Sequence, residues 1–296
     1  MSNIKKVLQQ LARNAKGSFK TVHDREVIIG RLANYLKDNN IQVKNVEHIK
    51  TKHIEGYIQS RQAQRVSKRT LQNEMSAIRR TLSQAGREKL IKSERLSSKT
   101  LNIHNASRQG TKIAITDKQF EAVLNKAIEN GKEDIAAALQ LCRYIGLRGA
   151  EVVRCNQSLK TWQTAINESK DTLRVVFGTK GKRPRDTRII NRERVKHAVD
   201  YAIKIVSKQN GKLIDKPNLK QTMNYWHDQA KTLGLTGKIA PHSLRYAFTH
   251  DLMNYYMEEG YPEEEALAMT SMDLGHGDGR GHYIKTVYGK KGEDDE

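Results

Sequence analysis

The chain of 296 residues contains 53 Lys and Arg against 33 Asp and Glu, and its formal charge of +20 predicts a polyanionic partner, with nucleic acid favoured over an anionic membrane surface. No apolar run approaches the ~18 residues of a membrane span, and the first ten residues lack the apolar stretch of a secretory signal. Two cysteines, Cys142 and Cys155, are too few for a disulfide framework or a cysteine-rich zinc site, so we expect buried thiols in a cytoplasmic protein.

The first third of the chain is its most basic part and is predicted to be helical. Residues 1–95 contain 21 Lys and Arg against eight Asp and Glu, a net charge of +13. Apolar residues recur at helical spacing in four stretches between Ile4 and Leu82. At roughly 150 residues per domain the chain is long enough for two domains. We predict a small all-helical domain over residues 1–92 and a linker, rich in Ser, Thr, Asn and Lys, over residues 93–112.

The last of these predicted helices begins with a basic first turn. Ser67 is a residue type that caps helix N-termini, and Lys68 and Arg69 follow it directly. Helix N-termini that carry hydroxyls and lysines suit contacts with phosphate. Lys68 and Arg69 are therefore candidate nucleic-acid contacts, and a capped, solvated helix start is the alternative interpretation.

The rest of the chain predicts a second, mainly helical domain with a small hairpin. Thr116 is placed to cap a helix, and an apolar helix is expected from about Asp134 to Gly146. Two short β-prone runs, residues 172–177 and 187–190, flank a basic turn, which is typical of a hairpin. The residues that follow the hairpin return to helical spacing.

Four short motifs in this second part place charged and aromatic residues in a fixed order. They are Gly146-Leu147-Arg148-Gly149-Ala150-Glu151, Gly178-Thr179-Lys180-Gly181-Lys182-Arg183 in the hairpin turn, His242-Ser243-Leu244-Arg245, and Leu274-Gly275-His276 followed by Tyr283 and Tyr288. Each motif alone would recur by chance in unrelated proteins. Their combination in this order, after a basic helical domain, is specific.

Together the motifs resemble the tyrosine recombinase (integrase) family of DNA strand-exchange enzymes over about residues 112–290. The resemblance implies a helical SAM-like core-binding domain over residues 1–92 and an α+β catalytic domain over residues 113–296. It also implies the chemistry of the family, in which a tyrosine attacks a DNA phosphodiester, forms a 3′-phosphotyrosine link and releases a 5′-hydroxyl. The link conserves the bond energy, so no ATP, metal or other cofactor is expected.

The resemblance assigns roles to the basic residues of the motifs. Arg148 and Arg245 would clamp the non-bridging phosphate oxygens, because guanidinium groups bind them in pairs and stay charged. Lys180 would be the general acid that protonates the leaving 5′-oxygen, with Lys182 as the rival on the same turn. For Lys182 and its neighbour Arg183 we favour nonspecific contacts with DNA phosphates.

The histidines and one carboxylate complete the expected site. His242 and His276 are expected to assist proton transfer and to hold the phosphate. Glu151, one helical turn after Arg148, is expected to orient nearby basic groups. Four histidines lie within 41 residues, from His242 to His282, but their spacing does not fit a metal site, and we predict none.

Two tyrosines compete for the role of nucleophile. Tyr283 follows His276 by seven residues and Tyr288 follows it by twelve, and the usual family separation falls between these values. Residues 277–281 include three glycines that could lengthen the spacing, and residues 284–287 resemble the family's approach to its tyrosine. On a helix the two tyrosines would lie about 140° apart and could not face one phosphate. We predict Tyr288, with Tyr283 as the alternative.

The sequence as a whole predicts a site-specific DNA recombinase of a phage or mobile element. The implied partners are double-stranded DNA recombination sites, further copies of the chain in a homotetramer on two sites, and an accessory directionality factor; no membrane is involved. We expect it in the cytoplasm, with the nucleoid. A non-catalytic basic DNA-binding or architectural protein and a type IB topoisomerase-like enzyme are the alternatives. The acidic residues 293–296 predict a short tail, whose docking on a neighbouring subunit is left open.

Overall fold

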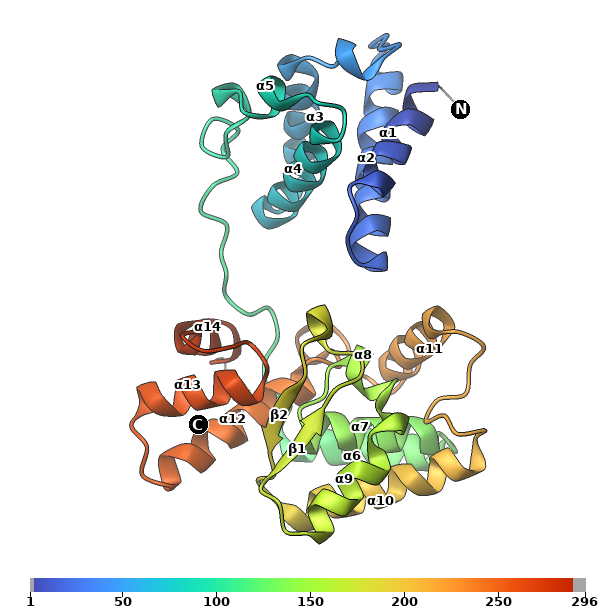
Figure 1. The fold of residues 1–296 in the computed structure, drawn as a ribbon, viewed down its shortest axis with the longest axis vertical. Coiled ribbons are helices and arrows are strands. Elements are labelled where there is room, and N and C mark those ends of the chain that lie inside the picture. The colour runs from blue at the N-terminus through green and yellow to red at the C-terminus, as the bar shows by residue number, and fades with distance from the viewer. Residues whose placement is uncertain (1–2, 290–296) are drawn as a thin grey trace. The chain divides into compact units, whose positions relative to one another are not determined.

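The computed structural model describes residues 3–289, so the predicted acidic tail lies outside the described residues. The chain divides into two compact units, Met1–Ser107 and Arg108–Glu296, each with its own hydrophobic core. Within the described residues the structure is mainly helical with a single two-stranded sheet (Figure 1), which confirms the predicted fold class.

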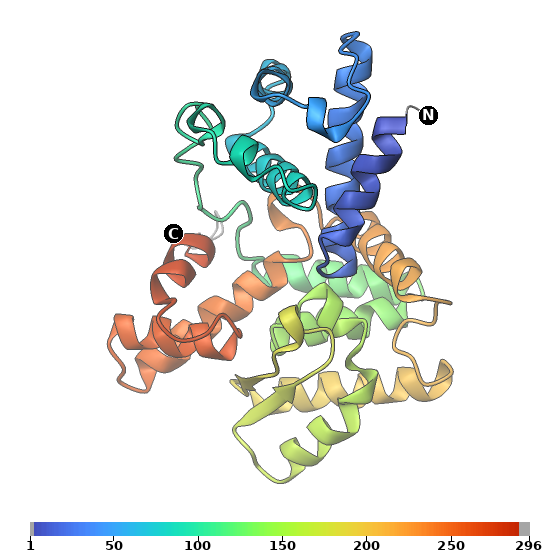
Figure 2. The same cartoon turned by 45° about the horizontal axis from the view of Figure 1, so that its top comes forward.

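The N-terminal unit is a group of helices around an aliphatic core. Its elements are α1 (Asn3–Asn14), α2 (Phe19–Asp38), the 3-10 turn η1 (Val46–His48), α3 (Thr51–Ala63), α4 (Lys68–Ser83), α5 (Glu88–Ile91) and η2 (Glu94–Leu96). The side chains of Ser18 and Ser67 cap α2 and α4 by accepting hydrogen bonds from the backbone N–H groups of Thr21 and Thr70. Helices α1 and α2 pack side by side, as Figure 2 shows in blue.

The polar segment after α5 is part of the N-terminal unit. Leu96, Leu101 and Ile103 are buried in its core. Of the segment predicted as a linker, residues 93–107 therefore belong to the first unit and residues 108–112 to the second. Polar residues dominate the composition of this segment, but three apolar side chains are enough to seat it against α3 and α4.

The second unit packs helices around a central apolar helix. Its elements are α6 (Asp117–Glu129), α7 (Glu133–Tyr144), α8 (Gly149–Val152), η3 (Cys155–Gln157), α9 (Leu159–Asn167), β1 (Thr172–Val175), η4 (Lys180–Lys182), β2 (Arg185–Arg188), α10 (Arg192–Lys208), α11 (Leu219–Thr232), η5 (Gly237–Ile239), α12 (Ser243–Glu258), α13 (Glu263–Asp273) and α14 (Gly281–Tyr288). Every residue of α7 from Asp134 to Arg143 is buried, because α6, α10 and α12 pack around this helix.

The predicted hairpin is present and is fixed to the helix that follows Arg148. Strands β1 and β2 are antiparallel, with Thr172 opposite Arg188 and Val175 opposite Arg185. Gly178, at the start of the turn, has a φ of +77°, and a Cβ atom there would lie 2.0 Å from the carbonyl oxygen of Ala150. The base of the turn therefore lies against the backbone of α8, and only glycine fits at this point.

Gly146 lies just after the end of the central helix and is the first residue of the first motif. Its φ is +64°, and a Cβ atom there would lie 2.2 Å from Cδ1 of Phe248 on α12. The left-handed conformation and the missing side chain are both required, since the aromatic ring occupies the space.

We predict that Gly146→Ala lowers the free energy of unfolding of the second unit by about 1–3 kcal/mol more than Gly131→Ala does, because only the former forces an overlap. Gly131 is the matched control, since its φ of +65° imposes the same backbone strain with no atom within 4 Å of the new Cβ. Both tryptophans, Trp162 and Trp226, are buried in the second unit, so their fluorescence during denaturation reports on this unit. An equal decrease in the free energy of unfolding for the two variants would contradict the prediction.

Candidate active site

The first motif is organised by hydrogen bonds between Arg148 and Glu151. Arg148 precedes α8, and its backbone N–H donates to Oε2 of Glu151 at 2.9 Å. Its Nη1 donates to Oε1 of the same carboxylate at 2.7 Å. The three-residue spacing brings both groups to one face of the helical turn. That Glu151 orients nearby basic groups stays a prediction.

The carboxylate of Glu151 is buried and also binds a residue that the sequence analysis did not select. Arg185, the first residue of β2, donates from Nη2 to Oε2 of Glu151 at 3.0 Å, and both side chains are almost fully buried. Burial by itself raises the pKa of Glu151, but the positive charges of Arg185, Arg245 and Arg148 lower it to about 2. Glu151 is therefore ionised at neutral pH.

Arg245 is fully buried and is held by backbone carbonyl groups. It lies in the first turn of α12 and donates from Nη1 to the carbonyl oxygen of Gly146 and from Nη2 to that of Leu274 at 2.5 Å. Arg148 donates to the same oxygen of Leu274 at 3.0 Å. Burial and the like charges of Arg148 and Arg185 lower the pKa of Arg245 to about 10, so the group stays charged at neutral pH.

Leu274 thus connects the third and fourth motifs to the first. Its carbonyl lies directly after the C-terminal end of α13, where helix carbonyls have no intrahelical partner and carry partial negative charge. Arg185 donates to the preceding carbonyl, that of Asp273, at 2.7 Å. The end of α13 therefore accepts hydrogen bonds from three guanidinium groups that would otherwise repel one another.

The histidines of the third and fourth motifs lie beside Tyr288. Nε2 of His276 lies 3.2 Å from the hydroxyl of Tyr288, and the rings of His242 and Tyr288 are 6.0 Å apart. Burial and the charges of Arg245 and Arg148 lower the pKa of His276 to about 3 and that of His242 to about 4, although part of His242 remains exposed. Both imidazoles are therefore neutral at pH 7, and Nε2 of His276 can accept the hydroxyl proton.

The two candidate tyrosines have different surroundings on α14. Tyr288 is 2% exposed, its ring packs 4.5 Å from that of Tyr246, and its carbonyl oxygen lies 2.6 Å from Nε2 of His250. Tyr283 is 36% exposed, and its ring centroid lies 4.9 Å from that of His276. Of the two, Tyr288 is the buried one, with its hydroxyl at hydrogen-bonding distance from the imidazole.

The hairpin turn carries three further basic residues. Lys180, Lys182 and Arg183 are exposed on the turn, and Lys182 has a left-handed backbone with a φ of +57°. Arg185, two residues further on, points into the interior instead. The period of two along β2, with Arg185 and Thr187 buried, is the signal that could have identified this arginine.

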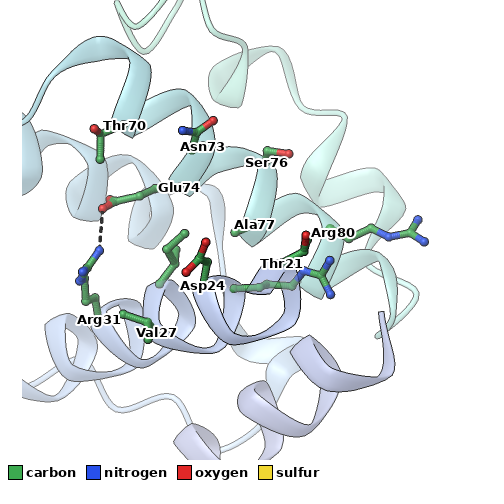
Figure 3. Close-up of a pocket in the computed structure, with 12 residues that line it drawn as sticks. Thr21, Asp24, Val27, Arg31, Thr70, Asn73, Glu74, Ser76, Ala77 and Arg80 are labelled. Carbon is green, nitrogen blue, oxygen red and sulfur yellow. Dashed lines mark hydrogen bonds and ion pairs between the residues drawn. The ribbon is translucent and has the colours of Figure 1, made fainter. Parts of the chain in front are cut away.

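The N-terminal unit contains a polar groove between α2 and α4, with a volume of about 560 Å³ (Figure 3). Arg31 of α2 reaches across it to Glu74 of α4 at 3.3 Å, and the buried Glu74 also binds Arg61 and the hydroxyl of Tyr57. The predicted nucleic-acid contacts Lys68 and Arg69 are exposed in the first turn of α4. The exposed residues Asn73, Ser76 and Arg80 continue along this helix and were not selected from the sequence.

Within residues 3–289, side chains of His, Cys, Asp and Glu nowhere form a group of three or more that could hold a metal ion. Over the same range, no helix combines the length and the apolar character that crossing a bilayer requires.

We predict that Glu151→Gln lowers the free energy of unfolding of the second unit by about 3–5 kcal/mol at pH 7, because the buried guanidinium groups lose their counter-charge. The pKa of Glu151 falls on folding from 4.5 to about 2, so its charge stabilises the folded state above pH 4.5, and this contribution is lost as the pH falls toward 2. The difference in the free energy of unfolding between wild type and variant should therefore become smaller as the pH falls from 4.5 toward 2.

The matched control for this prediction is Asp186→Asn. Asp186 pairs with Arg174 on the exposed face of the hairpin, where an ion pair contributes about 0–1 kcal/mol. Unfolding curves followed by tryptophan fluorescence at several pH values give the comparison. A loss for Glu151→Gln no larger than that of the control, or one that does not change with pH, would show that Glu151 does not have this role.

Two family models match the sequence. Residues 1–91 match the family model for the N-terminal domain of phage integrases, and residues 102–251 match the integrase family model. No curated protein matches the sequence.

Among solved structures, the Tn1549 transposon integrase in complex with transposon right end DNA is similar with a TM-score of 0.62 and 14% identity, over 96% of this chain and 94% of that chain. A lambda integrase tetramer bound to a Holliday junction is similar with a TM-score of 0.63 and 15% identity, over 98% and 78% of the respective chains. Together the two family models cover most of the sequence, and these structures share its fold. The chain therefore belongs to the integrase family of tyrosine recombinases, the enzymes of site-specific DNA recombination.

Proposed function

We propose that this protein breaks and rejoins duplex DNA at specific sites through a covalent 3′-phosphotyrosine intermediate, with Tyr288 as nucleophile and without a metal ion or ATP. The observation that carries the proposal is the 3.2 Å separation between the hydroxyl of Tyr288 and Nε2 of His276. A phenol with a pKa near 10 needs such a base close by, and a cationic surround, to act at neutral pH.

In the first step the hydroxyl oxygen of Tyr288 attacks phosphorus, and its proton passes to Nε2 of His276. Burial, together with the neighbouring guanidinium charges, lowers the pKa of His276 and makes it a weak base in the free protein. A bound phosphodiester brings a negative charge that offsets them, so the basicity of His276 rises when DNA occupies the site. The base is thus strengthened by the substrate itself.

The phosphate is clamped by Arg148 and Arg245 in this proposal. The Nε atom of Arg245 is buried without a hydrogen-bond partner among the described residues, and the side chain of Arg148 is 21% exposed. Both groups stay charged and their orientation is already set by the carbonyl of Leu274. They can therefore stabilise the charge that gathers on the non-bridging oxygens in the transition state.

Lys180 delivers the proton to the leaving 5′-oxygen as the bond between phosphorus and that oxygen breaks. The exposed turn carries the ammonium group, and the base of the hairpin is anchored to α8 beside Arg148. Rejoining reverses the step, since the 5′-hydroxyl of another strand attacks the phosphotyrosine and releases Tyr288. One phosphodiester is exchanged for another, so no external energy source is needed.

Exchange between two duplexes requires several active sites, and we propose a homotetramer on two recombination sites. A lambda integrase that is similar in fold is a tetramer bound to a Holliday junction. The basic N-terminal unit, with Lys68 and Arg69 at the start of α4, would hold the duplex together with Lys182 and Arg183. The same proposal includes a role in a phage or other mobile element, an accessory directionality factor and association with the nucleoid.

We predict that Tyr288→Phe abolishes the covalent protein–DNA adduct, whereas Tyr283→Phe keeps at least a tenth of the wild-type rate. The substrate is a pool of randomised duplexes that is first enriched for binding to the protein and then nicked, so that the cleaved strand diffuses away. The adduct is detected as a protease-sensitive shift of labelled DNA. Persistence of the adduct in Tyr288→Phe would rule out the assignment.

A second prediction concerns the proton donor. Lys180→Ala should slow cleavage about 10²–10⁴-fold on ordinary DNA, the range for loss of a general acid, and Lys182→Ala on the same turn should slow it far less. A substrate with sulfur in place of the 5′-bridging oxygen releases a thiolate, which needs no proton. On that substrate Lys180→Ala should recover most of the wild-type rate, and a failure to recover would argue against Lys180 as the acid.

A further inference from the structure

The first residues of the second unit lie against the helix that carries Tyr288. In residues 110–115, which we call the connecting segment, the backbone N–H of Gly110 donates to the carbonyl oxygen of Thr286 on α14 at 3.3 Å. Further along, Ile113 donates to Lys238 at 3.2 Å and Ile115 to Ser243, the first residue of α12, at 3.4 Å. The connecting segment thus joins α14 to the start of the helix that carries Arg245.

The contact at Gly110 leaves no room for a side chain. The residue is buried, and a Cβ atom there would lie 1.8 Å from the carbonyl oxygen of Val287 and 2.7 Å from the hydroxyl of Tyr246. Atoms at these distances overlap, and the nearer one belongs to the backbone of α14 and not to the flexible end of a side chain. Any larger residue at position 110 must move the connecting segment, the helix or both.

Tyr246 extends this contact to the proposed nucleophile. It is buried, its hydroxyl faces the backbone of Gly110 and Lys112, and its ring packs 4.5 Å from that of Tyr288. The ring of His242 lies 5.6 Å from the same ring of Tyr246. The connecting segment, Tyr246 and Tyr288 therefore form one continuous packed contact beside the two histidines.

We propose that the connecting segment is a positioning element of the recombinase, and that Gly110 and Tyr246 hold α14 so that the hydroxyl of Tyr288 stays within reach of His276. The inference rests on the proposed function of Tyr288. Because α14 has only eight residues, it would not be stable as an isolated helix, and its position depends on the elements that pack against it. The backbone contact at Gly110 supplies a constraint at the C-terminal end of the helix, where Tyr288 lies.

The test is the single-turnover rate of adduct formation for Gly110→Ala on nicked DNA at saturating concentration. We expect a rate constant at least tenfold below that of wild type, with an unchanged fraction of reacting enzyme and an unchanged dissociation constant for DNA. Loss of folded protein would instead lower the reacting fraction and leave the rate constant alone, and that result would overturn the proposal. Gly30→Ala is the control with ample room, since its Cβ would have no neighbour closer than 3.7 Å, and it should react as wild type does.

A second variant tests the proposal if Gly110→Ala gives too little folded protein for its rate constant to be measured. Tyr246→Phe removes only the hydroxyl that faces Gly110 and Lys112, and we expect a three- to tenfold lower rate constant at an unchanged reacting fraction. The rate constant of the double variant should fall by less than the product of the two single fold-reductions, because both changes disturb one contact. Fully independent effects would overturn the proposal.

Wild type and Tyr288→Phe are measured in parallel so that the two proposals fail separately. An adduct that forms in Tyr288→Phe shows that the nucleophile is wrong and removes the basis of the inference. An adduct that depends on Tyr288 and forms at the wild-type rate in Gly110→Ala shows that only the positioning role is wrong.

Discussion

The ionised carboxylate of Glu151 offsets the positive charge that is concentrated in the interior of the second unit. Three guanidinium groups, those of Arg148, Arg185 and Arg245, are gathered at one place in the protein interior, and Glu151 accepts hydrogen bonds from the first two. The carbonyl groups at the end of α13 supply further acceptors for all three arginines. Without this counter-charge, the desolvation of so many cations and their mutual repulsion would oppose folding.

The same concentration of positive charge sets the chemistry of the neighbouring groups. Together with burial, it lowers the pKa values of His242 and His276, and it creates a region that attracts an anion such as a phosphodiester. Glu151 offsets part of this charge, which allows the unit to fold, and under the proposed function the remaining positive charge binds the phosphate. Under the proposed function, bound DNA neutralises the positive charge that Glu151 does not offset in the free protein.

The fold class could be predicted from the sequence, and the site residues could be proposed from it, because both inferences use local patterns. Helical spacing and capping residues such as Ser67 and Thr116 are read within a few positions, and the motifs are short. The structure brings Arg148, His242, Arg245, His276 and Tyr288 into one cluster. The polar segment after α5 was less readable, since its three core residues are isolated among polar neighbours.

The supporting contacts could not be read in this way because they join residues far apart in the chain. Arg185 meets Glu151 across 34 positions, and Arg245 meets Gly146 across 99. The roles of the Leu274 carbonyl and of Gly110 depend on backbone atoms, which carry no sequence signal of their own. The different burial of Tyr283 and Tyr288 likewise depends on how α14 packs, and the separations from His276 along the chain do not reveal it.

The most direct test of the account is to identify the residue that carries the DNA. After the adduct is trapped and digested with trypsin and nuclease, cleavage after Arg280, Lys285 and Lys290 separates residues 281–285, which contain Tyr283, from residues 286–290, which contain Tyr288. Mass spectrometry should find the nucleotide phosphate on the second peptide, at Tyr288. A modified first peptide, or no modification on either, would contradict the central claim.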